Sequence, residues 1–91
     1  MLSKNQQKTL KALATKKERR LTGQFLVQGE KNVLELLNSS LELVSLFVTE
    51  TFADKHSKLL ATRPIQIVNE EELSKVSSIT SNNAAIAIVK Q

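Results

Sequence analysis

The chain has 91 residues, of which 41% are hydrophobic and 24% are charged, and it contains no cysteine. This balance predicts a single globular domain over residues 1–91 and argues against disorder. The lack of cysteine excludes disulfides and Cys-ligated zinc, and it favours a cytoplasmic protein. No segment approaches the roughly 20 apolar residues that a membrane-spanning helix needs, so we expect no membrane partner.

The charge is concentrated at the start of the chain. Residues 1–31 contain eight Lys or Arg and two Glu, a net charge of +6. Residues 32–91 contain five basic and seven acidic residues, a net charge of −2. Because a surface of one charge attracts ligands of the opposite charge, the basic first third indicates a polyanionic partner.

The first helix is expected to begin at a capping box formed by Ser3 and Gln6. Its leucines and its lysines recur at helical spacing on opposite faces, so one face can pack while the other presents a stripe of ammonium groups. The stripe consists of Lys4, Lys8 and Lys11. A second basic cluster follows as a segment without a helical pattern, and it contains Lys16, Lys17, Arg19 and Arg20.

Strands and helices are expected to alternate through the rest of the chain. The expected order is strand 24–28, helix 30–38, strand 43–49, helix 51–61, strand 65–68, a helix capped by Asn69, loop 77–83 and strand 84–89. Such alternation predicts an α/β fold, a three-layer α/β/α sandwich around a four-stranded, mostly parallel sheet.

Candidates for catalytic or metal chemistry are few. His56 is the only histidine and falls at the edge of an apolar helix face, and the three adjacent glutamates 70–72 point in different directions. Neither feature therefore indicates a metal site. The turn at Gly29 and Glu30 joins a strand end to a helix start, where α/β proteins often bind phosphate. A plain tight turn is the alternative interpretation of the same residues.

The basic residues also have two interpretations, since exposed lysines commonly only keep a protein soluble. Their arrangement on one face, the second cluster and the net negative charge of the remaining chain favour RNA as the polyanion. The three phenylalanines fall inside apolar patterns. Base stacking is therefore not expected, and the RNA would be recognised by its shape and backbone.

Residues 16–35 resemble the opening of RNA 2′-O-ribose methyltransferases of the SpoU/TrmH family, and they read KKERRLTGQFLVQGEKNVLE. That family has a basic stretch there, then Gly-x-Phe-Leu-Val-Glu-Gly and a helix, and Gln28 stands in place of its Glu. Residues 46–50 and 86–89 are similar to two later strands. The family often has Thr-Pro-Gln-Gly before the last strand, where this chain has Ser81, Asn82, Asn83 and Ala84.

The resemblance implies an N-terminal RNA-substrate-binding domain whose fold is similar to ribosomal proteins that bind kink-turn RNA. It also implies a catalytic domain, absent from this chain, that binds S-adenosylmethionine, methylates a ribose 2′-hydroxyl in rRNA or tRNA and forms a homodimer. No catalytic residue, metal or cofactor is therefore expected within residues 1–91. RNA contact is assigned to Lys4, Lys8, Lys11, Lys16, Lys17, Arg19, Arg20, Gly29, Glu30 and Lys31.

Two alternatives stay open. One is a free-standing kink-turn or ribosomal RNA-binding protein of the same fold. The other is a protein-interaction domain whose lysines only solubilise it. Continuation of the reading frame for roughly 150 further residues would favour the methyltransferase domain over the free-standing protein. RNA binding that weakens steeply with salt would favour both RNA interpretations over the protein-interaction domain.

Overall fold

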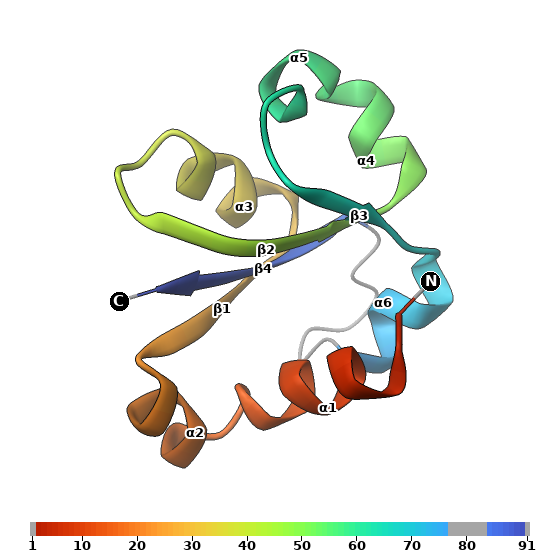
Figure 1. Ribbon diagram of the computed structural model, residues 1–91. Coiled ribbons are helices and arrows are strands. Elements are labelled where there is room, and N and C mark those ends of the chain that lie inside the picture. The colour runs from red at the N-terminus through yellow and green to blue at the C-terminus, as the bar shows by residue number, and fades with distance from the viewer. Residues whose placement is uncertain (1, 77–83, 91) are drawn as a thin grey trace.

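A computed structural model of the chain describes residues 2–76 and 84–90 and shows a four-stranded sheet with helices on both sides (Figure 1). The strands are β1 (Gln24–Gln28), β2 (Glu42–Val48), β3 (Ile65–Ile67) and β4 (Ala85–Lys90). The helices are α1 (Lys4–Ala12), α2 (Lys16–Thr22), α3 (Glu30–Leu37), α4 (Glu50–Lys55), α5 (Ser57–Leu60) and α6 (Glu70–Val76). All four expected strands are confirmed, each to within one residue at either end.

The sheet is mixed, and the expectation of a mostly parallel sheet was wrong. Its strand order is β1-β4-β2-β3, and only the β2–β3 pair is parallel. Strand β4 lies between β1 and β2 and runs antiparallel to both, starting where they end, with Ile86 beside Gln28 and Ala85 beside Val48. Alternation of strands and helices predicts the type of each element. It does not predict the direction of the last strand, which depends on the end of the sheet from which the chain enters β4.

Strand β4 is apolar on both of its sides because it is covered on both sides. Its small residues, Ala85 and Ala87, join the core beneath α3, α4 and α5 together with Val89. Ile86 and Ile88 point the other way, into the core shared with α1 and α6. This alternation follows from the period of two along a strand.

Helix α1 packs its leucines against the second core, and its start is fixed by hydrogen bonds. Leu10 is fully buried there. The expected capping box is confirmed, since the Gln6 amide N–H donates to Ser3 Oγ at 3.1 Å and the Ser3 N–H donates to Gln6 Oε1 at 2.9 Å. The Leu2 N–H also donates to Glu72 Oε2 of α6 at 2.7 Å.

Two helices differ from the sequence expectation. The second basic cluster, expected to lack helical structure, forms α2, which Thr15 caps at the start and Gly23 ends in a left-handed conformation at φ 67°. The single helix expected over 51–61 is divided into α4 and α5 at His56, whose φ of −120° and ψ of 33° interrupt the helix. The expectation depended on the periodicity of apolar residues. That periodicity reveals neither the caps of α2 nor the break at His56.

The loop expected over 77–83, with Ser81, Asn82 and Asn83, lies outside the described residues. Asn69 caps α6 as expected, because its Oδ1 accepts from the Glu72 N–H at 2.7 Å. Among residues 2–76 and 84–90, no helix is long and apolar enough to cross a membrane.

Replacing Leu10 by Ala should lower the free energy of unfolding by about 2–5 kcal/mol, because it leaves a cavity between α1 and the sheet. Chemical denaturation followed by circular dichroism measures this. The control is Thr9→Ala, an exposed position on the same helix, which should change stability by less than about 0.5 kcal/mol. Equal stabilities of the two variants would contradict the packing of α1 described above.

Candidate nucleic-acid interface

The lysine stripe of α1 faces solvent. Lys4, Lys8 and Lys11 are all exposed, whereas Leu10 and Leu13 on the opposite side of the helix are buried. At a rise of 1.5 Å per residue, the stripe extends over about 10 Å of helix axis. It therefore offers three positive charges in a row without involving any side chain that holds the helix in place.

Helix α2 continues the basic surface and orients its cations differently. Lys16, Lys17 and Arg20 are exposed. Arg19 is half-buried, and its Nη1 donates to the Ala14 carbonyl oxygen at 3.4 Å. Arg19 thus stabilises the turn between α1 and α2, unlike its exposed neighbours. Figure 1 shows α1 and α2 following one another on the side of the sheet opposite α3, α4 and α5.

The Gly29–Glu30–Lys31 turn lies at the other end of β1 from α2. Gln24, which follows α2, pairs with Lys90, whereas Gln28, which precedes the turn, pairs with Ile86 near the start of β4. Gly29 adopts a φ of 91°, and its N–H donates to the Ala85 carbonyl at 3.0 Å. The structure therefore divides the ten residues assigned to RNA contact into the α1–α2 surface and a separate turn.

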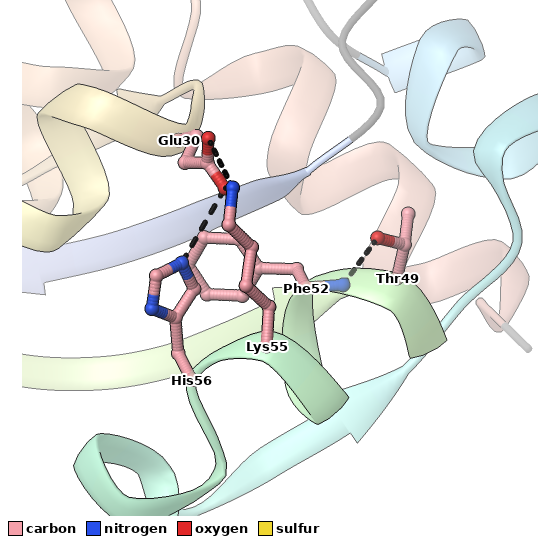
Figure 2. Close-up of polar contacts among 5 residues, drawn as sticks. All are labelled: Glu30, Thr49, Phe52, Lys55 and His56. Carbon is pink, nitrogen blue, oxygen red and sulfur yellow. Dashed lines mark hydrogen bonds and ion pairs between the residues drawn. The ribbon is translucent and has the colours of Figure 1, made fainter.

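Glu30 is engaged in an ion-pair cluster that the sequence analysis missed (Figure 2). The Lys55 ammonium donates to both of its carboxylate oxygens, at 3.5 and 3.3 Å, and His56 Nε2 lies 3.4 Å from Oε2. These contacts join the start of α3 to the end of α4. No signal in the sequence could have found the cluster, since its members are 25 and 26 residues apart and meet only through the sheet.

The cluster also accounts for His56. Its ring centroid lies 4.8 Å from that of the buried Phe52, so the imidazole packs on the apolar face while its Nε2 reaches Glu30. Hydrogen bonds from Lys55 first, and then from His56, hold the pKa of the Glu30 carboxyl below its usual value of 4.5. The imidazole and the carboxylate therefore contact each other within the fold.

The Glu72 carboxylate, in the first turn of α6, also forms hydrogen bonds that stabilise the fold. Glu72 accepts from the N–H groups of Leu2 and Asn69, at 2.7 and 3.4 Å. The Leu2 hydrogen bond is the main cause that lowers the pKa of Glu72. Within the described part of the chain, no three His, Cys, Asp or Glu side chains come together in a group that could hold a metal ion.

Residues 4–87 match the family described as the MRM3-like substrate binding domain. The chain belongs to this family. The match covers α1 through the first half of β4, so it includes both parts of the basic surface and the Glu30 cluster. The likeness to the SpoU/TrmH methyltransferases expected from residues 16–35 is confirmed by this match and by solved structures.

Three solved structures have the same fold as this MRM3-like domain. An AdoMet-bound rRNA methyltransferase from Sinorhizobium meliloti is 22% identical, with a TM-score of 0.76. A protein assigned to the TrmH family of RNA methyltransferases from Porphyromonas gingivalis is 25% identical, with a TM-score of 0.78. The SpoU methyltransferase AviRb from Streptomyces viridochromogenes, in complex with AdoMet, is 16% identical, with a TM-score of 0.78.

The MRM3-like domain is only part of the length of these enzymes. The S. meliloti structure matches 100% of this chain over 35% of its own length. The P. gingivalis structure matches 99% over 36%, and AviRb matches 98% over 36%. No curated protein matches the chain.

Replacing Glu30 by Gln should destabilise the MRM3-like domain at neutral pH and much less in acid. Because the folded-state pKa of Glu30 is lowered, its ion pairs stabilise the fold above about pH 4.5, and this contribution is lost as the pH falls through the lowered value. Melting temperatures of both proteins from about pH 3 to about pH 7 should therefore converge as the pH falls.

The control for this measurement is Glu35→Gln, which removes the same charge from an exposed position on α3. Its difference from the wild type should not narrow in acid in the same way. A gap that is constant with pH for Glu30→Gln would show that the cluster does not contribute through its charge.

Proposed function

We propose that this domain binds the rRNA or tRNA substrate of an S-adenosylmethionine-dependent RNA 2′-O-ribose methyltransferase. The observation that carries the proposal is the row of exposed cations on α1 and α2, in a chain that belongs to a substrate-binding family. These cations lie on surfaces that the core does not use, so their positions do not follow from the needs of folding. Phosphate groups are the natural partners of such a surface.

The surface suits the backbone of a folded RNA better than unstacked bases. Phe47 and Phe52 are 3% and 2% exposed, and Phe25 is half-buried against the first core. The chain has no Trp or Tyr. Stacking platforms for single strands require exposed aromatic rings, whereas double-helical RNA is held mainly through its phosphates and 2′-hydroxyls.

The α1–α2 surface is the proposed main contact. We assign phosphate contacts to its exposed cations, which are Lys4, Lys8, Lys11, Lys16, Lys17 and Arg20. Arg19 supports the turn between the helices. Lys31 is exposed beside Gly29 and is proposed as a separate contact at the far end of β1, whereas Glu30 serves the ion-pair cluster.

The catalytic step is proposed to belong to a second domain. Two of the similar enzymes hold AdoMet, and this chain matches about a third of their length. The residues described here would then bind and orient RNA while the other domain supplies the methyl donor and the homodimer contact. Cytoplasmic location and likeness to kink-turn-binding ribosomal proteins stay predictions.

A free-standing RNA-binding protein of the same fold is the second candidate, and the exposed cations favour it equally. The size of the natural protein distinguishes the two. A reading frame that continues beyond Gln91 by roughly 150 residues, the size of one domain, supports the methyltransferase. A stop codon at that point supports the free-standing protein.

Replacing Lys8 and Lys11 by Ala should weaken binding to a labelled RNA hairpin and flatten its salt dependence. Each lost phosphate contact should reduce the slope of log K against log salt by about one unit. Fluorescence anisotropy at several salt concentrations measures both quantities. The charge control is Lys58→Ala, which removes an exposed lysine from α5 on the other side of the sheet and leaves the Glu30 ion pairs intact.

The control should leave the slope nearly unchanged. Equal losses for each lysine removed in the two variants would show that only total charge matters and would contradict the assigned surface. Unchanged binding in both would favour the protein-interaction alternative, in which the lysines only solubilise the domain.

A further inference from the structure

We propose that Leu21 is an RNA contact, and that α2 presents to the RNA one apolar side chain beside three cations. The inference rests on the proposed function and adds to it a residue that charge alone does not reveal. Leu21 is 70% exposed, more than any other large hydrophobic residue among the described part of the chain.

The geometry of α2 places Leu21 on the same face as the exposed cations. At 100° per residue, Lys16, Arg20, Lys17 and Leu21 fall in that order within an arc of about 140°. The burial of the side chains agrees for the body of the helix, because these four are exposed whereas Glu18 and Arg19, on the other side, are half-buried. Thr22, the last residue of α2, also lies on that side and is exposed. The leucine therefore borders the cations instead of turning toward the core.

Folding does not explain this leucine. None of the residues of α2 is buried, and the helix is held by its caps, Thr15 at the start and Gly23 at the end. A polar residue at position 21 would serve these caps equally well. An exposed leucine gains free energy only when another surface covers it, at roughly 25 cal/mol for each Å² of apolar area removed from water.

RNA has the complementary chemistry. The phosphates on either side of a groove match the three cations, and the C–H groups of the riboses between them offer apolar surface to a leucine. The minor groove of A-form RNA is wide and shallow, so a side chain on a short surface helix can reach its floor. An anionic membrane is a poorer partner, because one leucine on a seven-residue helix provides little apolar area to insert.

The experiment compares Leu21→Ala and Leu21→Gln with Lys17→Ala in the 91-residue chain, using a labelled RNA hairpin with a double-helical stem. Both Leu21 variants should weaken binding about five-fold, as expected for losing part of the burial of one leucine. Their salt slope should stay that of the wild type, because no phosphate contact is lost. Lys17→Ala should weaken binding and also reduce the slope by about one unit.

The matched control is Ile65→Ala, which shortens an exposed apolar side chain on β3, the edge strand farthest from β1. It should bind the hairpin like the wild type. Because Leu21 is exposed, circular dichroism should show unchanged folding of both of its variants.

The outcomes separate this inference from the proposed function. If Leu21→Ala binds RNA normally while Lys8→Ala with Lys11→Ala binds weakly, RNA binding stands and the role of Leu21 is refuted. If all variants bind the hairpin like the wild type, the proposed function itself fails. Loss of binding to vesicles containing phosphatidylserine by Leu21→Ala, with RNA binding intact, would assign the face to a membrane and refute the inference.

Discussion

The fold depends on the insertion of β4 between β1 and β2. Its side chains contribute to both cores, with Ala85 and Ala87 on one side and Ile86 and Ile88 on the other. Strand β2 does the same, with Leu46 and Val48 in the first core and Phe47 in the second. The alanines lie in the core beneath α3, α4 and α5, while the isoleucines pack in the core shared with α1 and α6. Strands β1 and β2 do not pair with each other. Strand β4 pairs with both of them, so its hydrogen bonds join β1 to the rest of the sheet.

The same insertion determines how the polar groups are distributed. Strand β4 begins where β1 and β2 end, and there the starts of α3 and α4 gather with Glu30, Thr49 and their partners. That edge is occupied by internal contacts, since Thr49 caps α4 and Glu30 pairs with Lys55 and His56. Most exposed cations of the first third of the chain lie instead on α1 and α2, and α2 adjoins the opposite end of β1, whereas Lys31 is exposed at this edge. The sheet edge that binds ligands in many α/β proteins is here used to hold helices together.

The sequence predicts the features that depend on neighbouring residues better than the features that depend on residues far apart in the chain. Strand positions depend on local periodicity, and the capping box at Ser3 and the cap at Asn69 are local as well, so these expectations were confirmed. The direction of β4 and the Glu30 cluster depend on contacts between distant residues, which periodicity does not encode. Helix α2 was missed for a different reason, because a helix that buries no side chain has no apolar stripe to reveal it. Its signals were Thr15 and Gly23, a capping residue and a glycine seven residues beyond the first helical position.

The separation of core and charge explains how one fold persists at low sequence identity. The enzymes that share this fold are 16–25% identical to the chain, yet their TM-scores lie between 0.76 and 0.78. In α1 the leucines that pack and the lysines that face solvent occupy opposite sides, so a change in one set leaves the other in place. A domain built in this way can change the exposed charges of α1 without losing stability, because the core imposes no constraint on that side of the helix.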